Sequence, residues 1–168
     1  AVNSGTAALN LALSLLDLKN KEVILPSLTF VSTAHAIIQN GGKPVFVDVD
    51  NITNNINPIE IESHITKKTA LILPVHFGGL PCDLNSIMKI CRKNNLSLIE
   101  DAAHAAGSEY NGKKIGSHGE FVCFSFHPVK NLAMPTGGLI SINHNKHKNF
   151  KKILNSRRWC GITDRKDA

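Results

Sequence analysis

The chain has 168 residues, which suits one domain that buries roughly 70% of the surface of its unfolded form. Its 42% hydrophobic and 19% charged residues are ordinary for a soluble globular protein, and no apolar run reaches the ~20 residues that span a bilayer. The net charge of +6 arises in residues 143–168, which carry 8 basic and 2 acidic residues, whereas residues 1–142 carry 11 of each.

Apolar, strand-like runs alternate with helical patterns along the chain. The predicted strands are residues 22–26, 44–49, 70–75, 96–100, 120–126 and 138–142. The predicted helices are residues 6–18, 29–40, 57–65 and 83–95. Because several strands are nearly continuous runs of Ile, Leu and Val, the pattern predicts an α/β fold whose mostly parallel sheet is covered on both faces.

The basic segment at residues 143–168 also has a helical pattern. Phe150, Ile153 and Leu154 have the spacing of one helix face, with Lys and Arg on the other face. We interpret the segment as a helix with a solvated basic face, and we disfavour the alternative of a nucleic-acid-binding module.

Polar or unusual side chains follow most of the predicted strands. In open α/β sheets ligands bind beyond the carboxyl ends of the strands, so we expect these side chains to line one cleft. They are Ser27, Thr29, Phe30, His76, Asp101, His104, Ser125, His127 and Lys130. This collection of an acid, histidines, a hydroxyl, an aromatic ring and a lysine predicts a functional site.

Cysteine and histidine spacing gives no sign of a metal site. Cys82, Cys91, Cys123 and Cys160 form no CxxC pair, and the eight histidines form neither HxxxH nor HExxH. We expect no metal, and reduced, mostly buried thiols in a cytoplasmic protein.

The segment SGTAAL at residues 4–9 predicts the start of a helix. Ser4 is a good N-cap, and Gly5 and Thr6 come before strong helix formers. A helix N-terminus offers unpaired N–H groups and a partial positive charge to an anion. Taken alone, this segment favours an ordinary capped helix, and neither GxxxxGK[ST] nor GxGxxG occurs to indicate a nucleotide.

Two further segments supply candidate catalytic groups. Glu100 and Asp101 are adjacent at the end of a buried strand, so their side chains point to opposite faces. Asp101 either caps a helix or is held against a cationic group of a ligand. Lys130 follows Pro128 without a sequence-local acid, as suits a lysine that loses its proton to attack a carbonyl, although a solvated lysine remains the alternative.

A series of segments, taken in order, resembles the DegT/StrS-type sugar aminotransferases. The segments are NSGTAALNLAL, EVILPSLTFVSTAHAI, GGKPVFVDVD, LPVHFGGLPCDL and LIEDAAHAAGSEYNGKKIGSHGEFVCFSFHPVKN, followed by a Gly-Gly pair, and they extend from the first residue to about Gly161. The resemblance implies the fold type I architecture of pyridoxal 5'-phosphate (PLP) enzymes. We therefore expect the three-layer α/β/α large domain of an aspartate aminotransferase-like transferase, truncated at both ends.

The resemblance also implies roles for seven residues. Lys130 would bind PLP covalently and move the substrate proton. Asp101 would pair with the protonated pyridine nitrogen of the cofactor, His104 would bind the ring hydroxyl, and Phe30 would stack on the ring. The phosphate would be held by Gly5, Thr6 and Ser125.

The chain departs from the family pattern in two respects. Pro135 and Thr136 stand where the family commonly has Gly-Glu, which leaves the contacts of that loop unexplained. Family members are also longer at both ends, so we expect residues 1–142 to be the core of the large domain. Residues 143–168 would then be a basic helix and the start of the connection to a missing C-terminal domain.

The function that these features imply is transfer of an amino group from glutamate to a keto group of a nucleotide-linked sugar. The resemblance further implies a cytoplasmic homodimer with its active site at the subunit interface, acting in pathways such as polysaccharide biosynthesis. A family member acting on a cyclitol ketone and a catalytically silent regulatory or scaffold protein are the alternatives. The sugar dehydratases of the family have histidine in place of the lysine, so Lys130 disfavours that branch.

Overall fold

Six strands form the central sheet in the computed structural model, which describes residues 1–143 and 149–163. The strand order is β2-β1-β3-β4-β7-β8, and β8 alone runs antiparallel to its neighbour within this sheet. The strands are β1 (Glu22–Pro26), β2 (Lys43–Val47), β3 (Thr69–Ile72), β4 (Ser97–Asp101), β7 (Phe121–Ser125) and β8 (Gly138–Ile142). The predicted, mostly parallel sheet is therefore confirmed.

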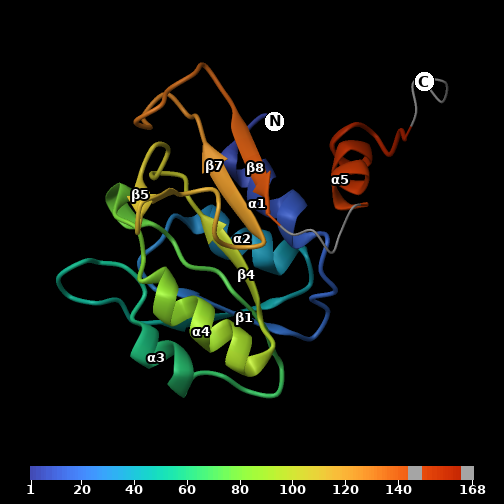
Figure 1. The fold of residues 1–168 in the computed structure, drawn as a ribbon. Coiled ribbons are helices and arrows are strands. Elements are labelled where there is room, and N and C mark those ends of the chain that lie inside the picture. Colours follow the sequence, from blue (N-terminus) through green and yellow to red (C-terminus); the bar gives the residue numbers. More distant parts are fainter. Residues whose placement is uncertain (144–148, 164–168) are drawn as a thin grey trace.

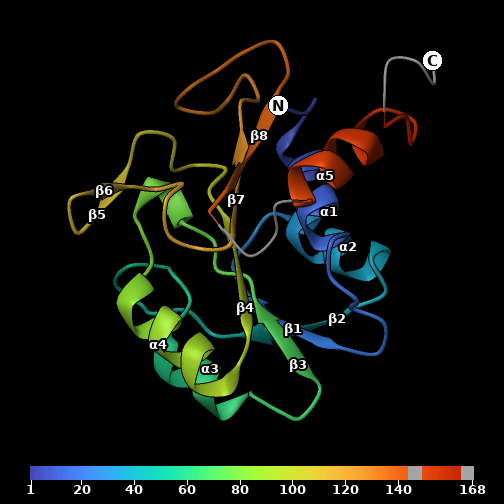
Figure 2. The ribbon, with the colours of Figure 1, turned by 45° about the vertical axis from the view of Figure 1, so that its right-hand side comes forward.

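Helices cover both faces of the sheet (Figures 1 and 2). One face is covered by α1 (Gly5–Leu13), α2 (Val31–Gln39) and α5 (Phe150–Arg158). The other face is covered by α3 (Pro58–Ser63) and α4 (Leu84–Asn94). This three-layer α/β/α arrangement confirms the predicted fold class.

Alternation along the strands explains why there are two hydrophobic cores. In β1, Val23 and Leu25 pack toward α1 and α2, whereas Ile24 packs toward the side of α4. All three side chains are fully buried, as a strand covered on both faces requires. A sheet of this kind leaves only the strand ends and loops free to build a site.

Polar caps determine where the helices begin and end. Ser4 accepts a hydrogen bond from the Ala7 N–H at the start of α1, and Asp83 accepts one from Ser86 at the start of α4. Asn95 ends α4 in the left-handed conformation, with φ of 53°. The first helix ends at Leu13, earlier than the predicted residue 18, because Leu15 and Leu16 bond three residues back rather than four.

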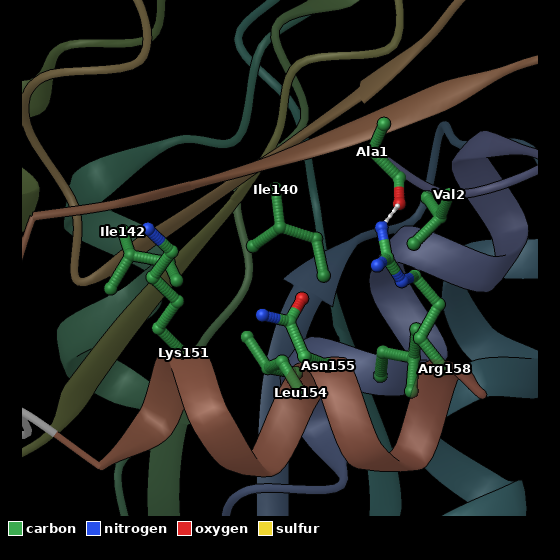
Figure 3. A pocket seen from close by; sticks show the side chains of 9 residues that line it. Ala1, Val2, Ile140, Ile142, Lys151, Leu154, Asn155 and Arg158 are labelled. Carbon is green, nitrogen blue, oxygen red and sulfur yellow. Dashed lines mark hydrogen bonds between the residues drawn. The ribbon is translucent and has the colours of Figure 1, made fainter. Parts of the chain in front are cut away.

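Helix α5 lies in the predicted basic segment and packs on α1. Leu154 is buried, and the ring of Phe150 lies 5.5 Å from that of Phe121. Figure 3 shows side chains of α5 pointing toward β8 and the first residues of the chain, around a cavity of about 210 Å³. The division of the chain at residue 142 stays a prediction, and residues 144–148 and 164–168 of the basic segment lie outside the described residues.

The described part of the chain also contains a short helical turn and a two-stranded hairpin. A 3₁₀ turn, η1 (Phe77–Gly79), follows β3, and β5 (Glu109–Tyr110) pairs with β6 (Lys113–Lys114) as an antiparallel hairpin (Figure 2). Within residues 1–143 and 149–163, no helix is long and apolar enough to cross a membrane, and no cluster of side chains has the composition of a metal site.

The cysteines are free thiols, and three of the four are buried, as predicted. They are Cys82, Cys91 and Cys123, whereas Cys160 is exposed. Burial raises the pKa of the Cys91 thiol to about 12 and raises the pKa values of the Cys82 and Cys123 thiols well above the ordinary value. The three buried thiols are therefore uncharged packing groups at neutral pH.

Candidate active site

A pocket of about 250 Å³ lies at the carboxyl ends of β1, β3, β4 and β7, beside the first turn of α1. Its lining contains all seven residues to which the family resemblance gives a role: Gly5, Thr6, Phe30, Asp101, His104, Ser125 and Lys130. These residues are spread over 126 positions of sequence, and the sheet topology brings them to one place.

The first turn of α1 forms one end of the pocket. In the described part of the chain, the N–H groups of Gly5 and Thr6 have no hydrogen-bond acceptor within reach. A Cβ atom on Gly5 would lie 2.7 Å from the Cβ of Ser125, and one on Gly138 would lie 2.3 Å from the carbonyl oxygen of Ser4. Two glycines thus let the start of α1 approach β7 and β8 closely, and leave two free donors beside the hydroxyls of Thr6 and Ser125.

Asp101 ends β4 and supplies the buried acid of the pocket. Its side chain accepts hydrogen bonds from the hydroxyl of Thr33 at 2.9 Å and from the N–H of Ala103 at 3.1 Å. Burial raises the pKa of the Asp101 carboxyl, while these two hydrogen bonds lower it. An isolated carboxylate at this depth is costly, so a cationic ligand group would be favoured beside it.

Glu100 points to the other face of the sheet, as predicted from strand alternation. It is fully buried and accepts hydrogen bonds from His76 Nε2 at 2.8 Å and from the N–H of Gly119. His76 Nδ1 accepts the N–H of Cys82 at 3.1 Å, so Nε2 carries the single ring proton and the imidazole is neutral. The carboxylate of Glu100 is satisfied within the protein.

The expectation that His76 lies in the cleft is wrong. Val75 forms a parallel bridge with Asp101 and lines the pocket, so the next residue, His76, points to the face of Glu100. His76 is fully buried there. A shift of one position along the chain therefore separates a pocket residue from a core residue.

His104 lines the pocket beside Phe77 and Gly78. Its Nδ1 accepts the N–H of Gly78 at 3.2 Å, which leaves the proton on Nε2, and its ring meets that of Phe77 edge to face at 6.3 Å. Burial and the positive charge of Lys130 lower the pKa of His104, whereas Asp101 raises it. His104 is thus set up as a neutral hydrogen-bond donor.

Lys130 lies in a short turn after β7. Its N–H donates to the carbonyl of His127 at 2.8 Å, and the next side chain, Asn131, donates to the carbonyl of Ala106 at 2.7 Å. No carboxylate of residues 1–143 and 149–163 lies within ion-pair distance of Lys130 Nζ. The backbone of the turn is held in place, while the amino group has no acidic partner among residues 1–143 and 149–163.

The structure shows what Thr136 of the Pro135-Thr136 pair contacts. Its hydroxyl donates to the carbonyl of Asn3, just before α1, and it lines the pocket. Two further hydrogen bonds of 2.9 Å join the backbone of Val2 and Gly138. The loop that carries Lys130 is therefore tied to the segment that begins α1. Nothing in the structure explains Pro135.

Exposed apolar side chains surround the pocket. Phe30 is 73% exposed and Val129 is 78% exposed, although both line it. Leu132 and Met134, in the same loop as Lys130, are also exposed. Apolar side chains gathered in this way are typical of surfaces that another protein covers.

Sequence reasoning missed several residues of this site. Thr33, Val75, Phe77 and Thr136 were not assigned to it, although each touches the pocket or Asp101. The register between β3 and β4 would have indicated Val75, but a single sequence does not contain that register. For Thr33 the one available signal was its place four residues after Thr29, on the same face of a helix.

An α/β/α sandwich with an acid, a lysine and a free helix N-terminus around one pocket belongs to the class of cofactor-binding enzyme domains. The chain belongs to the DegT/DnrJ/EryC1/StrS aminotransferase family, whose model matches residues 1–167. This confirms the family predicted from the sequence, and the cofactor of that family is PLP.

Curated and solved relatives agree with this assignment. The chain is 43% identical to the spore coat polysaccharide biosynthesis protein SpsC of Bacillus subtilis over 155 residues. The aligned region covers 92% of the chain and 40% of SpsC. PseC of Helicobacter pylori, an aminotransferase involved in the biosynthesis of pseudoaminic acid, has a TM-score of 0.90 at 30% identity over 98% of this chain and 44% of PseC.

A third relative has been solved with the cofactor. The putative sugar aminotransferase Spr1654 of Streptococcus pneumoniae, in its PLP form, has a TM-score of 0.85 at 32% identity over 92% of this chain and 43% of Spr1654. The same protein has been solved in a pyridoxamine phosphate form. The chain spans about 40% of the length of the curated relatives that it matches.

Proposed function

We propose that the protein is a PLP-dependent aminotransferase that transfers an amino group from glutamate to a keto group of a nucleotide-linked sugar. One observation carries the proposal: a single pocket is lined by a buried acid, a lysine and a helix N-terminus, and within the described residues the lysine has no acidic partner and two N–H groups of the helix have no acceptor. These groups match the three parts of PLP that a protein must bind, which are the pyridine nitrogen, the aldehyde and the phosphate.

The phosphate end of the pocket is the start of α1. The N–H groups of Gly5 and Thr6, with the hydroxyls of Thr6 and Ser125, would supply donors to the phosphate oxygens. The glycine at position 5 fits this role because a side chain there would collide with Ser125. The residues present therefore fit a bound phosphate group.

The ring end of the pocket is formed by β4 and the residues after it. Asp101 would hold a proton on the pyridine nitrogen through a charge-assisted hydrogen bond, which is worth roughly 1.5–3 kcal/mol. His104, protonated on Nε2, would donate to the ring hydroxyl, and Phe30 would cover one ring face.

Lys130 is the residue that would carry the reaction. When bound, the cofactor supplies an electron sink for charge that develops at the substrate Cα. Lys130 would bind it covalently before the substrate arrives, and would then take the proton from Cα as general base. No carboxylate of the described residues lies within ion-pair distance of Nζ, so no ion pair among them holds the amino group away from the cofactor.

The substrate class is supported by the relatives. PseC, SpsC and Spr1654 bear names that refer to sugar aminotransfer or to polysaccharide and pseudoaminic acid biosynthesis. Glutamate is the amino donor that we propose for the first half-reaction. We also propose a cytoplasmic homodimer. The exposed Phe30, Val129, Leu132 and Met134 support the homodimer, in which the partner subunit would cover this rim.

The test uses the protein at full length. We expect PLP to give a visible absorbance band with the wild type, and borohydride followed by peptide mass analysis to find the cofactor fixed on Lys130. The Lys130→Ala variant should show neither signal. A wild type that folds but gives no band and no adduct would remove the enzyme proposal and support a catalytically silent protein.

The substrate is tested in two half-reactions. Glutamate should convert the bound cofactor to its amino form, and nucleotide-linked keto sugars should convert it back. A cyclitol ketone is the matched competitor: if only the cyclitol restores the original absorbance, the sugar assignment is wrong while the aminotransferase assignment stands.

A further inference from the structure

Two threonine hydroxyls form a chain that ends on the acid of the pocket. The hydroxyl of Thr29 lies 2.8 Å from that of Thr33, and the hydroxyl of Thr33 lies 2.9 Å from Asp101 Oδ2. Thr29 precedes α2 and Thr33 lies in its first turn, whereas Asp101 ends β4, 68 positions after Thr33. Hydrogen bonds between side chains thus join the start of α2 to the end of β4.

Thr33 contacts the acid but not the pocket. It is fully buried, and it is not part of the pocket lining, whereas Thr29 and Asp101 are. A buried hydroxyl must find a partner, and the partner of Thr33 is the carboxyl group that the proposed function assigns to the pyridine nitrogen. Thr33 therefore acts on a ligand only through Asp101.

The direction of these hydrogen bonds follows from the charge on Asp101. An ionised carboxylate only accepts, so Thr33 donates its single proton to Oδ2 and is free to accept the proton of Thr29. The other oxygen, Oδ1, accepts the N–H of Ala103. Each oxygen then has one donor from the protein, and these fixed donors restrict how the carboxyl group can turn.

The other groups around Asp101 do little to stabilise its ionised carboxylate. His104 lines the same pocket, but its hydrogen bond from Gly78 shows that its ring is neutral, and His76 points to the other face of the sheet. Glu100, next to it in β4, is a like charge, and the buried Cys82 and Cys123 are uncharged thiols. No cation of residues 1–143 and 149–163 lies within ion-pair distance of Asp101. The hydroxyl of Thr33 and the N–H of Ala103 are its stabilising contacts.

We propose that Thr33 is a positioning residue that keeps Asp101 ionised and orients its carboxylate toward the cofactor ring. The proposal rests on the proposed function, because the pyridine nitrogen is what Asp101 would meet. Donors to a carboxylate favour its charged form, and that form is the one that pairs with a protonated pyridine. Thr33 thereby strengthens the hold of the protein on PLP without touching it.

The experiment measures PLP affinity by absorbance titration of the full-length protein. Thr33→Val removes the hydroxyl and keeps the branched shape, and we expect PLP to bind about tenfold more weakly. Thr33→Ser keeps the hydroxyl and is the matched control, with affinity expected within about twofold of the wild type. The nitrogen NMR signal of isotopically labelled PLP should show weaker protonation of the pyridine in Thr33→Val only.

A double-mutant cycle separates this role from a purely structural one. In an Asp101→Asn background the charge is absent, so adding Thr33→Val should cost less than about twofold in PLP affinity. Equal losses in both backgrounds, or a Thr33→Ser variant as weak as Thr33→Val, would overturn the inference. If Thr33→Val does not fold, Thr33→Ala takes its place in the same cycle.

The failure of the inference is distinct from failure of the proposed function. A wild type that binds no PLP removes the proposed function. A wild type that binds PLP as tightly as Thr33→Val does removes only the role of Thr33.

Discussion

Glu100 and Asp101 are neighbours in β4, and both carboxyl groups are buried, yet their surroundings differ. Glu100 meets a neutral histidine and a backbone N–H on the side of the sheet that faces α4. Asp101 meets a hydroxyl and a backbone N–H on the side that faces α2, and it also borders a pocket. One acid is enclosed by protein, and the other is accessible to a ligand.

The difference shows how a single strand serves both stability and binding. Alternation of side chains sends two successive acids to opposite layers of the fold. The hydrogen bonds of Glu100 to His76 and Gly119 join β4 to the segment after β3 and to the turn before β7. On the opposite face, the carboxyl group of Asp101 is available to a ligand in the pocket. We therefore expect changes at Glu100 to reduce stability and changes at Asp101 to reduce activity.

The largest expected effect on stability is that of Glu100→Ala. It leaves the N–H groups of His76 and Gly119 buried without an acceptor, so the free energy of unfolding should fall by about 3 kcal/mol. Denaturant unfolding measures the change. Glu62→Ala, which removes an exposed carboxylate paired with Lys93, is the control and should change stability by about 0.5 kcal/mol or less. Similar losses of stability in the two variants would show that the buried contacts of Glu100 are not important for stability.

Asp101→Asn should reduce activity and leave the stability without PLP unreduced. We expect kcat/KM of the full-length protein to fall about a hundredfold, because an amide cannot hold the pyridine proton through a charge-assisted bond. Its stability without PLP should not fall, because a buried charge is removed. A loss of stability as large as that of Glu100→Ala would show that Asp101 is mainly structural.

Thr136→Val tests a smaller contact on the pocket side. The lost hydrogen bond to the carbonyl of Asn3 should reduce the free energy of unfolding by about 1 kcal/mol. Thr136→Ser should retain most of that stability. If Thr136→Val is as damaging as Glu100→Ala, stability depends on the pocket side as much as on the enclosed side.

The last test follows the charge of Asp101 with pH. Burial raises its pKa above the ordinary value of about 4, so the folded protein without PLP binds this proton more tightly than the unfolded chain does. The stability of the wild type relative to Asp101→Asn should be highest below about pH 4 and should decrease as the pH rises through the raised pKa. Thermal unfolding over a pH series checks this, and a constant or rising difference would contradict it.

Much of the fold could be read from the sequence because short apolar runs and helical patterns are local signals. All six predicted strands are present, and seven of the nine side chains expected after them line one pocket, whereas Ser27 and His76 do not. The order of the strands and the reversed direction of β8 could not be predicted, because they depend on pairing between distant segments.

The site was predicted less completely than the fold, for reasons that particular residues show. Asp101 and Lys130 were found through strand ends and family resemblance. His76 was placed on the wrong face because one position decides the direction of a side chain at a strand end. Thr33 and Thr136 act through contacts with residues 68 and 133 positions away, which a single sequence does not reveal.

The pair of hydrogen bonds between Val2 and Gly138 has a consequence for the order of folding. These bonds close a loop of more than a hundred residues, and contacts of such long range form late because the loss of chain entropy must be met first. During synthesis, the start of α1 must wait for β8 to emerge before it reaches its final place. We therefore expect competence to bind the phosphate group to appear only in the final phase of folding, after the parallel strands have assembled.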